Sequence, residues 1–189
     1  DIRLPDMEGF EVVRRLRDFY RSGSVRRERV PVALVVRRAV ESVAARAQRE
    51  DVAISVDDAG AATLYADPVQ MQLVLHNLLT NAITYSPRGT RVAVTTRLSR
   101  GVVEISVTDQ GMGIPAADLE RIFERFYRID PARSRMTGGT GLGLAIVKHV
   151  CNNHGGDVTV WSVEGEGSTF TLRLPAYREN NRGTGVVEA

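Results

Sequence analysis

The chain has 189 residues, of which 43% are hydrophobic and 25% are charged, and its formal net charge is +2. This length suits one domain with a flank, and the composition excludes a disordered, collagen-like or disulfide-framework protein. The sequence shows neither a bilayer-spanning apolar stretch nor a signal peptide pattern, and its single cysteine excludes an intrachain disulfide. We therefore expect a reducing compartment.

Arginine is concentrated in the first quarter of the chain. Residues 1–49 hold twelve arginines against seven acidic residues. Such a bias can favour nucleic acid, but no aromatic residue interleaves with the arginines of 26–49. We therefore interpret this region as a solvated helix and linker, and we expect no nucleic-acid partner.

The first elements are weakly marked. Residues 1–29 predict a fragment or linker and no complete domain, although Phe10 to Tyr20 has a helical period. The apolar, β-branched run from Val30 to Val36 predicts a strand, or a strand entering a helix over Arg37 to Glu50. A further strand is predicted over Val52 to Val56.

From Asp67 onward the pattern is clear. Asp67 is suited to cap a helix whose first residue is Pro68, and the helix should end near Tyr85, before Pro87. The later predicted elements are strands over 91–98 and 102–108, helices over 117–127 and 141–153, a hairpin of strands over 158–162 and 169–174, and a disordered tail over 176–189.

One face of the helix beginning at Pro68 carries Asn77, Asn81 and Thr84. Two asparagines four residues apart oppose helix propensity, so this face needs an explanation. Each amide oxygen is a hard ligand of the kind that Mg²⁺ prefers. The alternative at this point is that both asparagines lie on a solvated face.

The second motif, Asp109 to Pro115, directly follows a predicted strand. Asp109 can accept hydrogen bonds at the strand end, while Gly111 and Gly113 allow close backbone approach to a ligand and a hinge. The alternative is a turn without a ligand.

The third motif is the glycine cluster over 138–144, which opens a helix. Free backbone N–H groups and the positive end of the helix dipole suit phosphate oxygens. No strand precedes the cluster, which argues against a dinucleotide-binding fingerprint, and the Gly-Lys-Ser/Thr of a Walker A loop is absent. The cluster therefore predicts a phosphate loop of another type.

Taken together, the motifs resemble the ATP-binding catalytic domain of sensor histidine kinases, in the ATPase class that includes gyrase, Hsp90 and MutL. The resemblance covers about 30–175, and the segment 132–135 is most similar to phosphate-responsive sensor kinases. The matching segments are the N box (77–87), the first glycine box (109–115), the F box (122–128), the second glycine box (139–144) and the segment 165–172.

This resemblance implies a fold as well as a ligand. It implies a two-layer α/β (α+β) sandwich of the Bergerat type, in which helices cover one face of a mixed β-sheet. It also implies a long ATP lid over 113–139.

The resemblance implies specific roles in binding Mg-ATP. Asp109 would accept the adenine amino group and disfavour guanine, and Asn81 would hold Mg²⁺ beside Asn77. Arg125 or Arg128 would meet phosphate charge. The implied ATP-binding set is Asn77, Asn81, Thr84, Tyr85, Asp109, Gly111, Gly113, Ile114, Phe123, Arg125, Arg128, Gly139, Thr140, Gly141, Leu142, Gly143, Leu144 and Thr169.

Two positions depart from the family pattern. Thr84 stands where family members commonly carry lysine, so one phosphate-contacting cation is missing and Arg128 would have to replace it. Asn77 stands where gyrase-like relatives carry a glutamate base, and an amide cannot take a proton from water. The second departure favours phosphoryl transfer to a protein nucleophile over ATP hydrolysis.

The phosphoaccepting histidine is not evident. His76, His149 and His154 lack the adjacent acidic residue usual at that site. The resemblance therefore implies an incomplete histidine kinase. Its partners would be a histidine-bearing dimerisation domain outside this chain and a cognate response regulator. It would be the cytoplasmic part of a sensor that reaches the membrane only through other segments.

The opening residues suggest a second family. Asp1 with Leu4 to Val12 resembles response-regulator receiver domains just after their phosphoaccepting aspartate. Asp1 is thus a candidate phosphosite, in a truncated, fused or chance segment.

Two alternative functions remain at this stage. Thr84 keeps open a nucleotide-binding module without transferase activity. An anti-sigma-type serine kinase shares these boxes, but the F box and the arginine-rich lid favour the histidine kinase branch.

Overall fold

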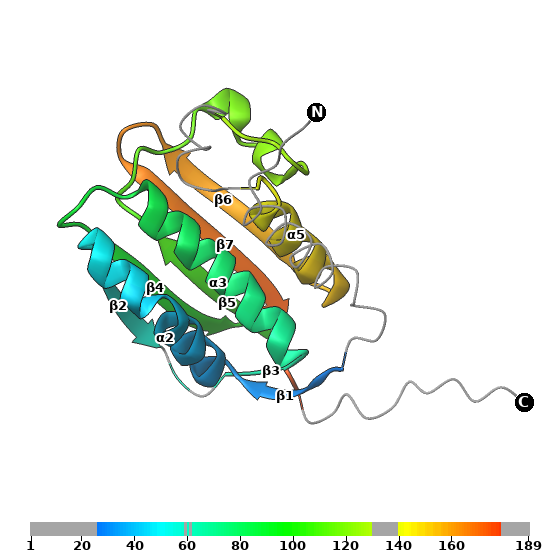
Figure 1. Ribbon diagram of the computed structural model, residues 1–189. Helices are drawn as coiled ribbons and strands as arrows, with labels where there is room; N and C mark the ends of the chain where they lie inside the picture. Colours follow the sequence, from blue (N-terminus) through cyan, green and yellow to red (C-terminus); the bar gives the residue numbers. More distant parts are fainter. Residues whose placement is uncertain (1–25, 59, 61, 130–139, 179–189) are drawn as a thin grey trace, which may run out of the picture.

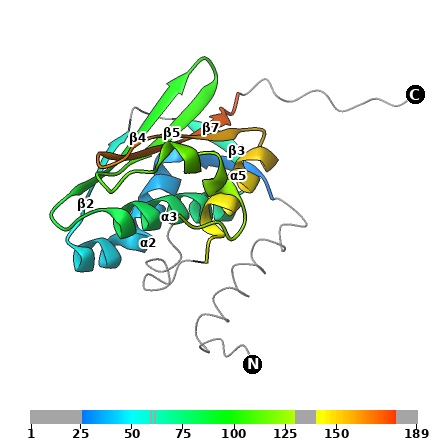
Figure 2. The ribbon, with the colours of Figure 1, turned by 90° about the horizontal axis from the view of Figure 1, so that it is seen from above.

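The computed structural model describes residues 26–58, 60, 62–129 and 140–178, and these form two layers. Figure 2 shows the β-sheet as one layer and the helices as the other. The predictions for Asp1, the receiver-like segment, lid residues 130–139 and tail residues 179–189 lie outside the described residues. The predicted disordered tail begins too early, because the N–H groups of Ala176 and Tyr177 donate to backbone carbonyl oxygens (2.9 and 2.7 Å).

The main sheet has five strands in the order β2-β4-β5-β7-β6. β2 runs parallel to β4, and every other neighbouring pair is antiparallel, so the sheet is mixed. The bounds are β2 Ala53–Asp58, β4 Arg91–Ser99, β5 Val102–Thr108, β6 Asp157–Val163 and β7 Gly167–Pro175.

Three helices cover one face of this sheet, with α3 between α2 and α5 (Figure 1). Their bounds are α2 Val32–Glu50, α3 Pro68–Tyr85 and α5 Gly143–Asn153. Alternate residues of the strands, such as Val94, Ile105 and Leu172, are buried against the helices. The predicted two-layer sandwich is therefore confirmed. None of the helices in the described part of the chain has both the length and the apolar character that crossing a bilayer requires.

The middle helix begins and ends as predicted. The Asp67 carboxylate accepts hydrogen bonds from the backbone N–H groups of Val69 (3.0 Å) and Gln70 (3.2 Å), and Pro68 opens the helix. This cap fixes the start of α3, and therefore the height at which its asparagines lie over the sheet.

The start of the domain differs from the prediction. The strand β1 spans only Glu28–Pro31, and α2 begins at Val32. The β-branched run is the buried stripe of a helix, because Val32, Val35 and Val36 face the core at helical spacing. β1 pairs with β3 (Thr63–Ala66), a strand that the sequence analysis missed, in a separate two-stranded sheet.

The predicted helix over 117–127 is also wrong. This stretch contains two 3₁₀ turns, η1 (Ala116–Asp118) and η2 (Arg121–Phe123). Phe126 then takes a left-handed conformation, with φ of 64°, which an α-helix cannot continue. Gly141, with φ of 68°, likewise delays the start of α5 to Gly143.

Candidate functional site

A cavity of about 300 Å³ opens between α3, the loop after β5, and the start of α5. Three segments far apart in the sequence therefore meet at one site. The predicted residues that line it are Asn77, Asn81, Tyr85, Asp109, Gly113, Ile114, Arg128, Thr140, Gly141, Gly143 and Leu144.

Asp109 lies at the end of β5 and is 8% exposed. Its Oδ1 accepts hydrogen bonds from the backbone N–H groups of Gly111 (2.9 Å) and Ser168 (3.2 Å). Burial raises the pKa of Asp109, and the two backbone hydrogen bonds oppose that rise only partly. Within the described residues both bonds reach Oδ1, so Oδ2 remains able to accept a hydrogen bond from a ligand.

The α3 side of the cavity carries buried polar groups. Asn77 is only 6% exposed, so the alternative of a solvated asparagine face is wrong for this residue. Within the described residues, Asn77 Nδ2 and Thr80 Oγ1 are buried without a hydrogen bond. Buried polar groups are normally satisfied, so their lack of partners at a cavity wall points to a polar ligand.

The segments after η2 and before α5 repeat this feature. Arg128 Nη2 and Thr140 Oγ1 are also buried without a partner among the described residues. Among the described residues no side chain caps the start of α5, and Gly143 there lies against the Asn77 side chain. A helix N-terminus and a guanidinium that line the same cavity favour an anionic ligand group.

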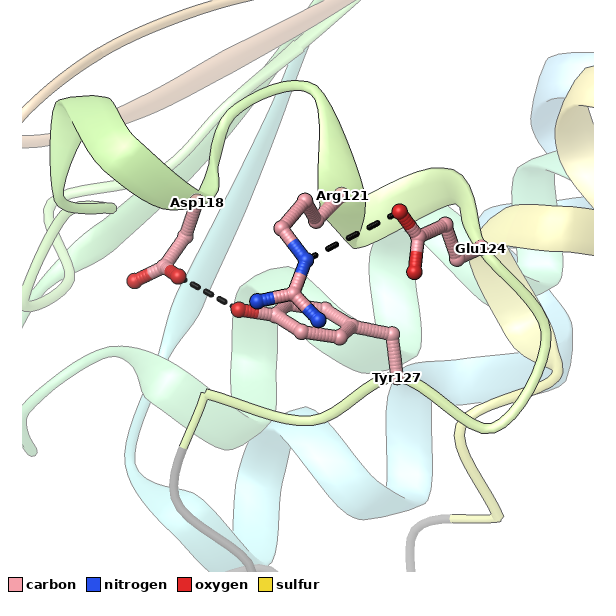
Figure 3. Close-up of polar contacts among 4 residues, drawn as sticks. All are labelled: Asp118, Arg121, Glu124 and Tyr127. Atoms are coloured by element: carbon pink, nitrogen blue, oxygen red, sulfur yellow. Dashed lines mark hydrogen bonds and ion pairs between the residues drawn. The ribbon is translucent and has the colours of Figure 1, made fainter.

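A group of polar contacts holds Tyr127, which lines the cavity (Figure 3). The Tyr127 hydroxyl donates a hydrogen bond to Asp118, and this bond raises the pKa of Tyr127. The Arg121 guanidinium lies 4.3 Å from the Tyr127 ring centroid, and its Nε lies 3.7 Å from Glu124 Oε1. These contacts join η1 and η2 to Tyr127.

The loop after Asp109 lies close against its surroundings. A Cβ at Gly113, where φ is 69°, would clash with the Val163 carbonyl oxygen. A Cβ at Gly111 would lie 2.7 Å from the Tyr85 carbonyl oxygen. The two glycines are therefore required by close approach, and at Gly113 also by conformation.

Six predicted residues do not line the cavity. In two of them, Thr84 and Thr169, the side chain forms its hydrogen bonds away from the cavity. Thr84 donates to the Thr80 carbonyl oxygen and accepts from Arg46 Nη2 at 3.0 Å, so its hydroxyl is engaged toward α2. Thr169 bonds Thr108 across the sheet (3.0 Å), because residues of a strand alternate and Ser168 takes the cavity side.

Three of the other four support the site from outside its lining. Phe123 packs edge-on against Phe170, and Leu142 is buried in the core. Gly111 contributes its N–H to Asp109, whereas Arg125 is exposed.

Sequence reasoning missed several lining residues. Thr80 and Tyr127 lay inside recognised boxes, and the alternation of β7 could have indicated Ser168 and Phe170 in place of Thr169. The missed residues are Thr80, Met112, Pro115, Ile122, Tyr127, Ile129, Glu164, Ser168 and Phe170.

The three histidines have structural partners outside the cavity lining. His76 Nδ1 lies 2.9 Å from Ser42 Oγ, and His149 Nε2 lies 3.0 Å from Asn153 Nδ2. His154 joins the end of α5 to the start of α3 through its contact with the N–H of Asp67.

Comparison with known proteins identifies this arrangement. The family model described as histidine kinase-, DNA gyrase B-, and HSP90-like ATPase matches residues 66–178. The sensor-like histidine kinase SenX3 of Mycolicibacterium smegmatis is 48% identical over 148 residues, which are 78% of this chain and 38% of that protein. The phosphate regulon sensor protein PhoR of Pseudomonas aeruginosa is 42% identical over 121 residues, or 64% of this chain and 27% of that protein.

A solved structure agrees with these matches. The mycobacterial sensor histidine kinase MprB superposes with a TM-score of 0.69 and 34% identity, covering 79% of this chain and 97% of that chain. The chain belongs to the histidine kinase-, DNA gyrase B- and HSP90-like ATPase family. Within it, the chain is an ATP-binding catalytic domain of the sensor histidine kinase type. It spans well under half the length of its SenX3 and PhoR relatives.

Proposed function

We propose that this domain binds ATP with Mg²⁺ and donates the γ-phosphoryl group to a histidine on a separate helical hairpin. The observation that carries the proposal is one cavity that joins a buried carboxylate, Asp109, to buried polar groups that have no partner among the described residues. The carboxylate suits a purine amino group, and the buried polar groups suit a polyanion.

At the base end, specificity would come from Oδ2 of Asp109. Adenine presents an amino group that can donate to this oxygen, whereas guanine presents a carbonyl oxygen at the same position. The Oδ1 bonds to Gly111 and Ser168 hold the carboxylate in place before any ligand binds. Mispairing a buried polar group costs about 1–3 kcal/mol, which is enough to prefer ATP over GTP.

At the phosphate end, the charge would be met by Arg128 and by the N–H groups at the uncapped start of α5. Thr140 Oγ1 and Asn77 Nδ2 supply further hydrogen bonds, which would remove their unsatisfied state. Thr84 faces Arg46, which supports the expectation that Arg128 takes the place of the missing lysine.

The donor set also fits Mg²⁺. Asn81 lines the cavity and offers a hard amide oxygen, with Asn77 one helical turn away. Magnesium in such sites is held by one or two side chains together with substrate phosphates. When bound, Mg²⁺ would supply charge neutralisation across the phosphates, while Asn81 would fix its position.

The reaction would depend on positioning. A histidine nitrogen attacks the γ-phosphorus, the bond from that phosphorus to the bridging oxygen breaks, and ADP leaves. The cavity residues hold the phosphates in line and neutralise their charge. Asn77 cannot accept a proton from water, so the site favours a protein nucleophile over hydrolysis.

In this proposal the domain acts beside a dimerising, histidine-bearing hairpin and passes the phosphoryl group to a response regulator. It would function in the cytoplasm, and contact with a membrane would come through other segments of a longer sensor. The ATP-binding unit would extend over 30–175.

The test combines binding with transfer. Calorimetric titration with ATP and Mg²⁺ should be saturable, and an added histidine-bearing hairpin should acquire acid-labile label from γ-labelled ATP. Asn81→Ala should abolish both the magnesium dependence of binding and the transfer. Asn152→Ala, which changes an exposed asparagine on α5, is the matched control.

The outcomes separate the alternatives. A wild-type protein that shows no saturable ATP binding would refute the proposal. Binding without label transfer would instead support a nucleotide-binding module that lacks transferase activity.

A further inference from the structure

One hydroxyl outside the predicted site joins the loop after Asp109 to the start of β7. Ser162, near the end of β6, accepts a hydrogen bond from the backbone N–H of Ile114 (2.9 Å). It donates to the Gly167 carbonyl oxygen (2.8 Å) and lies 2.9 Å from Ser168 Oγ. A hydroxyl has one hydrogen to donate, so the Ser168 hydroxyl must donate to Ser162.

This arrangement fixes the hydroxyl of a residue that lines the cavity. With its hydrogen directed to Ser162, the Ser168 hydroxyl presents acceptor lone pairs to other neighbours. The backbone of Ser168 also bonds to Asp109. The Ser168 N–H donates to Asp109 Oδ1 (3.2 Å), and the Ser168 carbonyl oxygen accepts from the Asp109 N–H (2.9 Å). Ser162 is thus one contact away from the carboxylate that would recognise adenine.

The same hydroxyl holds the loop that follows Asp109. Ile114 comes directly after Gly113, whose backbone lies against the Val163 carbonyl oxygen. The N–H of Gly165 donates to the Met112 carbonyl oxygen at 2.8 Å. The turn between β6 and β7 therefore packs against the loop that follows Asp109. Ser162 contributes the side-chain hydrogen bond that holds this loop in place.

We propose that Ser162 is a positioning residue for nucleotide binding. It fixes the backbone of Ile114 and the hydroxyl of Ser168, so that the Asp109 carboxylate and its loop are set before the purine arrives. This inference rests on the proposed ATP-binding function. It assigns no contact between Ser162 and the nucleotide, and Ser162 does not line the cavity.

The structure offers a matched control on the same sheet. Ser106 Oγ and Thr171 Oγ1 lie 2.9 Å apart, so Ser106→Ala also removes a hydroxyl–hydroxyl hydrogen bond between neighbouring strands. Neither residue lines the cavity. A general loosening of the sheet would affect both variants, whereas a positioning role would affect Ser162→Ala alone.

The experiment measures ATP and GTP affinity and amide hydrogen exchange in the whole chain. Ser162→Ala should weaken ATP binding about tenfold, the effect of losing a hydrogen bond of ordinary strength. The ratio of ATP affinity to GTP affinity should decrease, and hydrogen exchange at the Ile114 backbone amide should accelerate. Ser106→Ala should leave all three unchanged, and Ser162→Thr, which keeps the hydroxyl, should restore tight binding. In transfer assays the change should appear in KM and not in kcat.

Each result decides the question. If Ser162→Ala binds ATP as wild type does, or if Ser106→Ala weakens binding equally, the positioning role is overturned. The same holds if a folded Ser162→Thr fails to recover affinity. Failure of the wild-type protein to bind ATP would instead remove the proposed function on which this inference depends.

Discussion

At the scale of single residues, Asp109 meets two opposing demands. The free protein disfavours its charge, because burial raises its pKa. The proposed ligand requires that charge, because an ionised oxygen is the better acceptor for an amino group. Such a conflict is typical of a binding site that lowers the stability of the free protein. A mutation can therefore separate the structural role of Oδ1 from the ligand-binding role of Oδ2.

Asp109→Asn should separate stability from binding. The asparagine Oδ1 can still accept from Gly111 and Ser168, and a neutral amide avoids the cost of burying a charge. The amide NH₂ group of the asparagine would then face the adenine amino group. Both groups donate, so no hydrogen bond could form between them. We expect an unchanged or higher Tm together with ATP affinity reduced about 10- to 100-fold. Thermal unfolding and calorimetry would check this, and a lower Tm with normal affinity would contradict it.

The same carboxyl group predicts how binding depends on pH. Because its pKa is raised, the protonated form of the free protein is favoured at a higher pH than for an ordinary aspartate. ATP affinity should therefore fall as the pH drops through that raised pKa. Calorimetry across acidic pH should show the decline in the wild-type protein, and Asp109→Asn should lack this component.

At the scale of elements, His154 joins two helices. Its Nε2 accepts from the Asp67 N–H at the start of α3 (3.1 Å), and its Nδ1 lies 2.8 Å from the Val150 carbonyl oxygen within α5. Burial lowers the pKa of His154; the hydrogen bond to Val150 and the Asp67 charge oppose that change, and Arg27 adds to it. The neutral ring therefore holds these helix ends together.

This junction predicts a loss of stability in mild acid. With the folded pKa below its ordinary value of 6.5, the neutral ring stabilises the fold above that pH. That contribution is lost as the pH falls toward the lowered pKa, because protonation removes the Nε2 acceptor. Tm measured from pH 8 to pH 5 should decline in the wild-type protein, and His154→Gln should decline less. Parallel curves for the two proteins would exclude this role.

The turns η1 and η2 predict a separate effect on binding. Tyr127→Phe removes the hydrogen bond to Asp118 and should weaken ATP binding several-fold, because this bond holds Tyr127 in the cavity lining, while exposure limits its strength. The Tm should change little, because these turns lie at the edge of the core. Glu124→Gln breaks only the exposed ion pair with Arg121, and its affinity should equal that of the wild type. Equal losses in both variants would argue against a specific role for Tyr127.

The elements predicted well are those with strong local signals. The Asp67 cap and Pro68 gave the start of α3, and the alternation of β4 and β5 marked both strands. β3 has only four residues and joins directly to the cap of α3, so its pattern was too short to recognise. Valine-rich Val32 to Val36 favoured a strand by propensity, but tertiary packing made it helical.

In the candidate site, too, residues within local motifs were predicted, whereas residues brought in by strand pairing were not. Residues in recognised boxes, such as Asn77, Asp109 and Gly143, do meet at one cavity. The roles of Ser162 and Ser168 depend on the pairing of β6 with β7, which brings Ser162 opposite Ser168. Such a pairing joins the site only in three dimensions, so no single motif could indicate it.

At the scale of the whole molecule, the cavity connects α3, the loop after β5, and α5, so a ligand there should resist the opening of all three. Cys151 on α5 reports such opening, because its side chain is fully buried and burial raises its pKa to about 12. A thiolate at neutral pH is therefore scarce in the closed protein, and a thiol reagent should react chiefly after the helix separates from the sheet.

ATP should therefore protect this cysteine. A ligand that binds only the native state at 100 times its Kd stabilises that state by about 2.7 kcal/mol, which corresponds to a roughly 100-fold slower reaction. The rate should return toward its unliganded value in Asp109→Asn at the same ATP concentration, because that variant binds weakly. Urea-unfolded protein supplies the control, since its thiol should react at one rate with or without ATP. If ATP saturates the native protein and the reaction rate stays unchanged, α5 opens independently of the cavity, and the wall it forms does not close on the nucleotide.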